Sequence, residues 1–243
     1  MSNEELKGLL LIGEDIEYQN ITIRNYKLRQ ILKELKLDKY NYLLGISILD
    51  VKDVLKDSKI DIDKLKMYDI ICEVPEFTDW FIEFLNVFTN LEWEFGRFRD
   101  FVAYNESGKR VRFTEDMYDG FMKIFKKMYC VGKGKNEKIE TKYANDKVKK
   151  YFEEFEEWET NLPKKNDVKI TLLSILESLA TKHDNLNMIT IQSYTVYQLM
   201  ATYYRTEQID NYDNLIKSYY TGMLDIEKIN ILDSHWAKET DII

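Results

Sequence analysis

Proline and glycine are scarce in this chain of 243 residues, which contains two prolines and nine glycines. An all-β sandwich needs frequent turns, and these two residues are prominent among those that build turns. Their scarcity therefore argues against an all-β fold and favours long helices.

Cysteine and histidine are rarer still, with two residues of each. Cys72 and Cys130 lie far apart in the sequence, and with only His183 and His235 beside them the chain lacks the ligand spacing of a zinc site. Isolated cysteines of this kind are typical of proteins in a reducing cytosol. We expect neither a metal nor another cofactor.

The chain also lacks an excess of positive charge and a long apolar run. Its formal net charge is −8 and its lysines alternate with acidic residues, so we expect no nucleic-acid partner. No stretch approaches the roughly eighteen apolar residues of a membrane span. The N-terminus is acidic and does not resemble a signal peptide. We expect a cytosolic protein without a membrane partner.

Hydrophobic residues make up 44% of the chain, which is enough for a packed core. The first segment, LLLIGEDIEYQNITIRNY, predicts two short strands, LLLIG and ITIRNY, with Gly13 and Asn20 supplying turns. From Lys27 onward the period becomes helical. The apolar residues of that helical face are Leu28, Ile31, Leu32 and Leu35.

An aromatic segment begins at Pro75, a residue that suits the first turn of a helix. We expect the helix to run through PEFTDWFIEFLNVFTNLEWEF. Its aromatic side chains either line a ligand site or belong to the core or a partner interface, and the second interpretation is favoured. The next segment, FVAYNESGKRVRFT, alternates as a β-hairpin does, and Thr114 then caps another helix.

The remaining segments are predicted to be helical, apart from CVGKGKNEKIETKYANDK, which has little apolar content and is the best linker candidate. Its GKGK lacks the pattern of a phosphate-binding P-loop. The sequence thus predicts a mainly α protein with minor β structure: a helical bundle-like chain with a small N-terminal β element and an inserted β-hairpin. It is organised either as a single domain or as an N-terminal region at 1–130, a possible linker at 131–145 and a C-terminal helical region at 146–243.

Catalytic chemistry finds little support in the sequence. Asp233, Ser234 and His235 are the residue types of a hydrolase triad, but adjacent side chains diverge on a helix or a strand and cannot converge. His183 suits the C-terminal end of a helix, where it complements the helix dipole. The acidic stretch DSKIDID at 57–63 lacks the glycine of a calcium loop. We therefore expect a protein that is not an enzyme.

Two parts of the chain resemble tail-module proteins from phages of Gram-positive bacteria. The N-terminal part is LIGEDIEYQNITIRNYKLRQILKELKLDKYNYLLGISILDVKDVL, followed by DIDKLKMYDII; the family likewise has a short strand pair, a helix and a Tyr-containing helix. The C-terminal part is TIQSYTVYQLMATYYR, followed by YDNLIKSYYTGMLDIEKINILDSHWAKE, with a YQL element, an arginine and a terminal His–Trp.

The resemblance implies a phage tail assembly chaperone in the host cytoplasm, with tape-measure or tail-tube subunits as partners and without catalytic residues. A chaperone of this kind needs a helical scaffold with apolar grooves for amphipathic helices. The aromatic segment and the resemblance together suggest these partner-binding residues: Trp80, Phe84, Trp93, Tyr197, Tyr204, Arg205, His235 and Trp236.

Two alternatives remain open. The first is a structural virion component, such as a baseplate, neck or tail subunit, which would stay in the finished particle. The second is a small helical enzyme or ligand-binding regulator, which would need a cleft with convergent polar groups.

Overall fold

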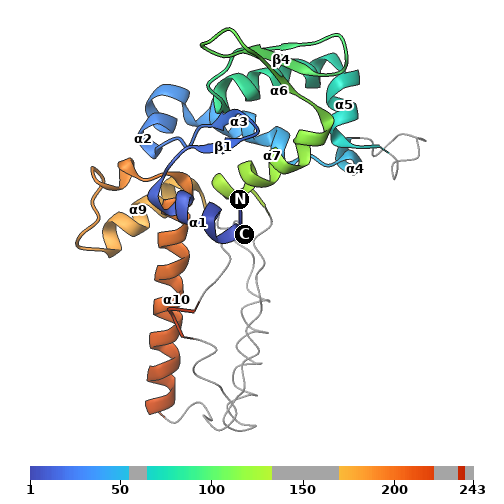
Figure 1. Ribbon diagram of the computed structural model, residues 1–243. Helices are drawn as coiled ribbons and strands as arrows, with labels where there is room; N and C mark the ends of the chain where they lie inside the picture. The colour runs from blue at the N-terminus through green and yellow to red at the C-terminus, as the bar shows by residue number, and fades with distance from the viewer. Residues whose placement is uncertain (55–64, 133–169, 222–234, 239–243) are drawn as a thin grey trace. The chain divides into compact units, whose positions relative to one another are not determined.

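The computed structural model describes residues 1–54, 65–132, 170–221 and 235–238 (Figure 1). These residues are mainly helical with two small sheets, which confirms the predicted fold class. The chain divides into two compact units. The described residues of the first unit are 1–54, 65–132 and 189–199, and those of the second are 170–188, 200–221 and 235–238.

The linker predicted at 131–145 lies almost wholly outside the described residues. The boundary between regions 1–130 and 146–243 therefore stays a prediction. The division into units adds one feature that the sequence did not indicate: residues 189–199, which come late in the chain, belong with the first unit.

The prediction that LLLIG forms a strand is wrong, because α1 (Asn3–Ile12) runs through it. Ser2 begins the helix: its hydroxyl accepts a hydrogen bond from the N–H of Glu5 at 3.1 Å, and the Glu5 carboxylate accepts one from the N–H of Ser2. Gly13 ends the helix in the left-handed conformation, with φ at 81°. Leucine is a strong helix former, and caps at both ends specify a helix for this run.

The N-terminal β element is the antiparallel pair β1 (Ile16–Tyr18) and β2 (Ile21–Ile23). Gln19 and Asn20 join the strands with φ of 49° and 68°, as a tight two-residue hairpin requires. Both isoleucines of β2 are buried and Thr22 is partly exposed, so the predicted alternation in ITI is confirmed.

The helix predicted from Lys27 is present, but its geometry changes along its length. α2 (Leu28–Gln30) passes into a π-helix, η1 (Ile31–Leu35). Lys36 then breaks the helix with φ at 67° and ψ at 141°. α3 (Leu37–Ile48) and α4 (Val51–Val54) follow.

α5 (Met67–Glu73) leads into α6 (Pro75–Phe88), which Pro75 opens as predicted. The prediction that this helix includes WEF is wrong, because those residues form β3 (Trp93–Phe95). Thr89 accounts for the change of direction. Its hydroxyl donates to the carbonyl of Leu85 at 2.8 Å and accepts from the Trp93 indole N–H at 2.8 Å.

The predicted hairpin is confirmed as β4 (Phe101–Tyr104) and β5 (Arg110–Phe113). β3 pairs with β4, so the hairpin belongs to an antiparallel sheet in the order β3-β4-β5. Gly108 in the hairpin turn has φ at 73°, a conformation that favours glycine. α7 (Glu115–Met128) follows Thr114, as predicted.

Aromatic side chains of α6, α7 and the three-stranded sheet form the core of the first unit. The ring of Phe125 lies edge-on to Phe84 and Phe88, with centroids 4.7 and 4.8 Å apart, and Phe81 meets Phe101 of the sheet at 5.0 Å. Each such pair contributes roughly 0.5–1.5 kcal/mol beyond burial alone. Three of the four phenylalanines of α6, Phe81, Phe84 and Phe88, are fully buried, which confirms the core interpretation for them, whereas Phe77 is half-buried.

Residues 189–199 complete the first unit. They begin with the short 3-10 helix η3 (Ile191–Ser193). The N–H of Leu28 donates to the carbonyl of Tyr194 at 2.8 Å, and Lys27 forms an isolated β-bridge with Thr195. The side-chain amide of Gln198 donates to the carbonyl of Leu11 at 2.8 Å. The late segment is therefore tied to both α1 and α2.

The second unit contains α9 (Leu172–Lys182) and the part of α10 (Val196–Tyr220) that follows residue 199. The buried residues of α9 lie along one face of the helix: Ile175, Leu176 and Leu179. His183 ends α9, as predicted, and its Nε2 lies 2.9 Å from the hydroxyl of Thr206 in α10. Along the described residues, none of the helices combines the length and the apolar character needed to cross a bilayer.

Candidate partner-binding surface

Four of the seven arginines in the sequence fall within residues 97–112. Residues 93–113 carry five basic and three acidic side chains, in a chain whose net charge is −8. In an antiparallel sheet, directly opposite residues point to the same side. The pairs Val102–Arg112 and Tyr104–Arg110 therefore place Val102, Tyr104, Arg110 and Arg112 on one side of the sheet. The opposite side packs into the core. We define the arginine face as Val102, Tyr104, Arg110 and Arg112 of this side together with Arg97, Phe98 and Arg99 of the β3–β4 turn. The acidic Glu94, which faces Val102, lies on the same side.

Asp100 holds this face together. Its side chain is about 1% exposed, and a buried carboxylate must be paired to be tolerated. It accepts from Nε of Arg112 at 2.7 Å and lies 3.8 Å from the guanidinium of Arg110. Its other oxygen accepts from the N–H of Phe98 at 3.3 Å. One carboxylate thus joins the two arginines of β5 to the turn between β3 and β4.

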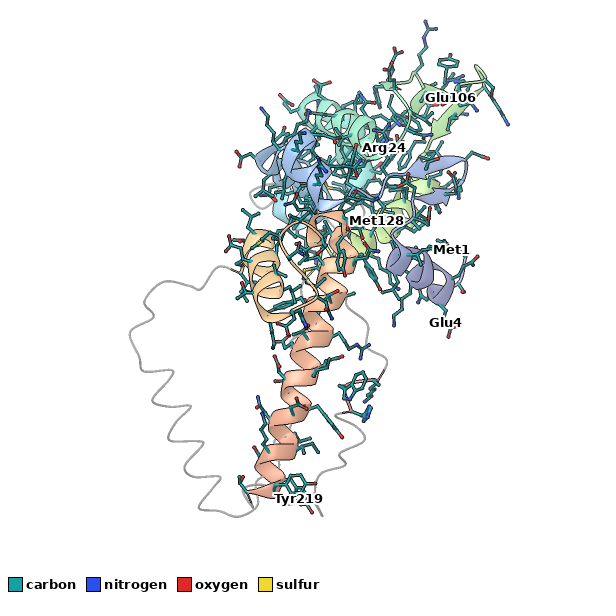
Figure 2. The ribbon with its side chains drawn as sticks, turned by 90° about the vertical axis from the view of Figure 1, so that its left-hand side faces the viewer. Met1, Glu4, Arg24, Glu106, Met128 and Tyr219 are labelled. Atoms are coloured by element: carbon teal, nitrogen blue, oxygen red, sulfur yellow. The ribbon has the colours of Figure 1, made fainter. Side chains whose placement is uncertain are left out.

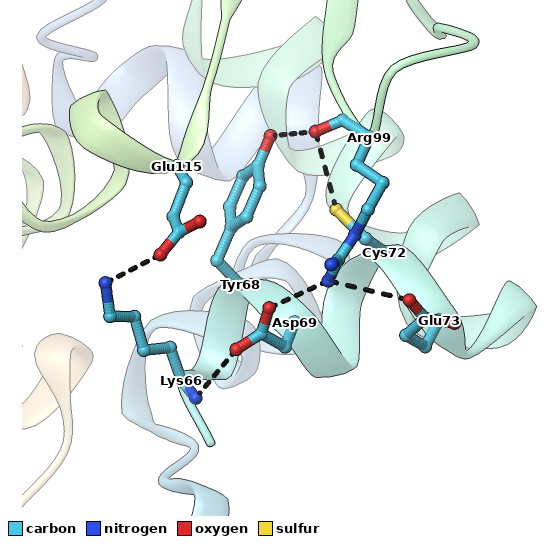
Figure 3. Close-up of polar contacts among 7 residues, drawn as sticks. All are labelled: Lys66, Tyr68, Asp69, Cys72, Glu73, Arg99 and Glu115. Atoms are coloured by element: carbon cyan, nitrogen blue, oxygen red, sulfur yellow. Dashed lines mark hydrogen bonds and ion pairs between the residues drawn. The ribbon is translucent and has the colours of Figure 1, made fainter. Parts of the chain in front are cut away.

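Arg99 fixes the same turn to α5 (Figure 3). Its backbone is left-handed, with φ at 52°, and its carbonyl accepts from the hydroxyl of Tyr68 at 2.9 Å. Its guanidinium pairs with Asp69 at 2.7 Å and with Glu73 at 3.5 Å. The Asp69 carboxylate raises the pKa of Arg99, because it stabilises the charged guanidinium. Contacts to both its backbone and its side chain therefore hold this residue.

α5 is itself anchored at its N-terminal end. Lys66 pairs with Glu115 of α7 at 2.6 Å, and its N–H donates to the Asp69 carboxylate at 3.0 Å (Figure 3). Tyr68 extends into the core, where its ring meets Tyr118 at 5.7 Å, and burial raises the pKa of its hydroxyl. The turn thus rests on a helix that is fixed to α7 and to the core.

Phe98 is the most accessible apolar residue of the arginine face, at 76% exposure, and Tyr104 follows at 64%. An exposed aromatic on an ordered turn loses little conformational entropy when a partner covers it. Aromatic residues and arginine are also the types enriched in protein interfaces and in their energetic hot spots. Figure 2 shows Glu106, in the turn that follows Tyr104 at the other end of β4, at an outer end of the first unit, whereas Met128 lies inside it.

The structure places the four predicted partner-binding residues of the first unit mostly in its interior. Phe84, Trp93 and Tyr197 are at most 3% exposed. Trp80 is half-buried and stacks on the exposed ring of Tyr42, with centroids 5.1 Å apart. A partner of the folded chain therefore meets Trp80 more readily than the other three.

The four predicted residues of the second unit include three that meet. The guanidinium of Arg205 donates to the carbonyl of Trp236, and the rings of His235 and Trp236 stack with centroids 5.5 Å apart. Trp236 is 42% exposed. Tyr204 is half-buried on α10, beside Tyr203. Partner binding by all eight residues stays a prediction. In the second unit Arg205, His235 and Trp236 lie together, whereas three of the four in the first unit are buried.

The eight predicted residues omit the arginine face entirely. The signal was present in GRFRDFVAY and KRVRF, where arginines alternate with aromatic and apolar residues. Arginines that alternate with aromatic residues suit a protein interface, whereas the prediction from composition treats basic residues only as a patch for nucleic acid.

Within the parts of the chain that the structure describes, no group of three or more His, Cys, Asp or Glu side chains is placed to hold a metal ion. The acidic stretch at 57–63, together with Asp233 and Ser234, lies outside the described residues. Burial raises the pKa of Cys72, and it raises that of Cys130 to about 12, so neither thiol is activated as a nucleophile.

A family model described as the YomV second domain matches residues 163–241. It is a phage-type family, and the match is consistent with a phage protein. The matched range includes the described residues of the second unit together with 189–199. Comparison with curated proteins and with solved structures gives no match.

Proposed function

We propose that the chain is a non-enzymatic phage protein that acts in tail morphogenesis, as an assembly chaperone that binds tape-measure or tail-tube subunits through the arginine face. The observation that carries this proposal is Phe98: a 76% exposed aromatic between two arginines, on a turn held by Asp100 and by α5. The match to a phage-type family and the resemblance to tail-module proteins support the setting.

The chemistry of the face suits an amphipathic, acidic helix. Phe98 and Tyr104 offer apolar area for the buried side of such a helix, and Arg97 offers a cation at its edge. Among the described residues, no carboxylate pairs with Arg97, whereas Arg99 pairs with two and Arg110 and Arg112 share that of Asp100. A partner carboxylate at Arg97 would then add electrostatic complementarity, which gives specificity and speeds association.

The test is a pull-down of the tagged full-length chain from cells that express its neighbouring genes, read by mass spectrometry. We expect recovery of a tape-measure or tail-tube protein, and a loss of at least tenfold with Phe98→Ala, because removing a central aromatic anchor typically costs about 2 kcal/mol or more. Ile48→Ala is the matched control, since Ile48 is 65% exposed in the same unit but far from the turn in sequence.

Two outcomes would contradict the proposal. If neither kind of tail protein is recovered, the chaperone role is wrong. If Phe98→Ala and Ile48→Ala reduce capture equally, the arginine face is not the contact surface. Mass spectrometry of purified particles then separates a chaperone, which is absent from them, from a structural virion component, which is present.

A further inference from the structure

A second concentration of positive charge lies on residues 24–39, which carry six basic and two acidic side chains. Some of these charges have partners inside the chain. Lys39 pairs with Glu83 of α6 at 2.8 Å, and the guanidinium of Arg24 donates to the hydroxyl of Tyr26 at 3.2 Å. Arg29 of α2 and Lys33 of η1 lie between these two residues in the sequence, and their surroundings differ from those of Arg24 and Lys39.

Arg29 and Lys33 line a hollow of about 650 Å³, together with Leu32 and Gln192. The first three residues come from α2 and η1, and Gln192 comes from η3. The hollow is shallow and widely open to solvent, and Leu32 is the one apolar side chain among the four that line it. All of its walls belong to the first unit.

The two sides of the hollow are fixed to each other by backbone contacts. The N–H of Leu28 donates to the carbonyl of Tyr194, and Lys27 is bridged to Thr195. Leu28 and Ile31 are fully buried beneath the exposed Arg29, so α2 and η1 cannot turn without disrupting the core. The hollow is therefore a preformed feature of the fold.

Arg29 and Lys33 make no ion pair with any described residue. They lie four positions apart, a spacing at which like charges on a helical surface repel and destabilise the helix. An anion between them would remove this repulsion. Arginine offers oxygen anions two parallel N–H donors, and lysine offers a mobile point charge.

The backbone at the hollow is unusual in two respects. Lys33 is part of the π-helix η1, a rare geometry that occurs frequently at functional sites. The next break, at Lys36, has φ at 67° and ψ at 141°, a conformation that a residue with a side chain adopts only under constraint. Such strain collects at ligand clamps and switch regions. Both features separate this segment from an ordinary solvated helix.

We propose that the hollow binds a small molecule that carries an oxygen anion, either a phosphate or a carboxylate, on an apolar or aromatic frame. Arg29 and Lys33 hold the anion, the amide of Gln192 supplies a polar contact from the facing wall, and Leu32 packs on the frame. This site does not depend on the proposed tail function, because it uses neither the arginine face nor a protein partner.

The experiment is a ligand-observed NMR titration of the full-length chain with three probes on one frame: phenyl phosphate, benzoate and benzyl alcohol. We expect at least one anion to bind no less than tenfold more tightly than the neutral alcohol. The stronger anion identifies the source of charge as a phosphate or a carboxylate. The double variant Arg29→Gln/Lys33→Gln should weaken anion binding by at least tenfold.

The matched control is Lys52→Gln/Lys123→Gln, which removes the same charge from exposed positions of the same unit. It should change anion affinity less than twofold. Gln192→Ala, which leaves the charge unchanged, should weaken binding about threefold, as expected for the loss of one neutral polar contact. The proposal is overturned if neither anion outcompetes benzyl alcohol, or if both double variants lose affinity equally, since that would indicate the overall field of the chain and not a site.

Discussion

The carboxylate of Asp100 connects two parts of the three-stranded sheet. It accepts hydrogen bonds from β5 and from the β3–β4 turn, and it does so from a position with about 1% side-chain exposure. Gly96 belongs to the same arrangement, because its N–H donates to the carbonyl of Asp100 at 2.6 Å and a Cβ on Gly96 would lie 2.2 Å from Asp100 Oδ1. The close approach of these two residues requires glycine.

Replacing Asp100 by alanine should therefore lower the free energy of unfolding by about 1–3 kcal/mol, since it leaves polar groups of the turn and of β5 without their acceptor. Gly96→Ala should cost a similar amount through the clash. The double variant should lose less than the sum, because the clash with Oδ1 is gone. Urea unfolding measures all three, with Glu94→Ala, an exposed change in the same sheet, as the control expected within about 0.5 kcal/mol.

One buried thiol and several buried tyrosine hydroxyls keep their protons to a higher pH in the folded chain, so the free energy of unfolding should depend on pH in the alkaline range. Burial raises the pKa of the Cys130 thiol from 9.0 to about 12, and it raises the pKa values of the Tyr40, Tyr118 and Tyr129 hydroxyls above their ordinary 10.0. In the unfolded chain these groups lose protons at their ordinary values, so above pH 9 the native state holds more protons. Stability is then complete below pH 9 and falls as pH rises through the native values.

The urea midpoint should therefore decline between pH 8 and pH 10, and Cys130 should account for about 1 kcal/mol of the loss. Cys130→Ala should remove that part and leave the decline that the tyrosines cause. A midpoint that is flat to pH 10 in the unsubstituted chain would contradict the burial of these protons.

At the scale of an element, α1 shows how the capping residues at its two ends determine the secondary structure of a short apolar segment. Gly8 lies inside α1 and Gly13 caps its C-terminal end, so their surroundings differ. A Cβ on Gly8 would meet nothing within 4 Å, whereas Gly13 has φ at 81° and a Cβ there would lie 3.1 Å from Gln198. The two glycines therefore have opposite consequences for stability.

Gly8→Ala should stabilise the chain by roughly 0.5–1 kcal/mol, because alanine loses less entropy in a helix interior. Gly13→Ala should destabilise it by about 1–2 kcal/mol, since it places a side chain in the left-handed region and against the amide of Gln198. Thermal unfolding of the two variants compares them directly. An equal shift of both midpoints in one direction would mean that α1 does not end at Gly13.

Local patterns in the sequence predicted those elements whose signals are local. The hairpin, the opening of α6 at Pro75 and the end of α9 at His183 each depend on one turn or capping residue. LLLIG and WEF were misjudged for different reasons: the first helix depends on a cap at Ser2, and the strand depends on pairing with β4. For the arginine face, the register of β4 and β5 adds what the sequence pattern does not show, because it places Val102, Tyr104, Arg110 and Arg112 on one side of the sheet.

The hollow at Arg29 and Lys33 could not be predicted from the sequence, for a different reason. Gln192 lies more than 150 positions away in the sequence, and nothing in the pattern around residue 192 indicates that η3 contacts α2. Helical periodicity predicts which face of α2 and η1 is buried. It does not predict that η3 lies opposite the exposed Arg29 and Lys33.

At the scale of the whole chain, residues 189–199 belong to the first unit although they come late in the sequence. The buried side chains of this segment are Ile191, Thr195, Val196, Tyr197 and Leu199. Burying each of the apolar ones contributes roughly 1.5–3 kcal/mol. A fragment that ends at residue 132 exposes the surface that these side chains cover.

We expect residues 1–132 alone to be less stable than the same fragment joined through a flexible linker to residues 189–199. Near-ultraviolet circular dichroism and the thermal midpoint measure the difference, and a fusion with the eleven-residue segment in scrambled order is the control. Equal midpoints for the three proteins would show that the segment contributes nothing to the first unit.

The late position of this segment also sets an order of events during synthesis. A ribosome that has made residue 132 has supplied most of the first unit, but residue 199 is still 67 codons away. At about 5–20 residues per second this interval lasts roughly 3–13 s. Throughout it, the apolar surface that awaits residues 189–199 stays uncovered on a nascent chain, so the completion of the first unit is timed by translation as well as by the speed of folding.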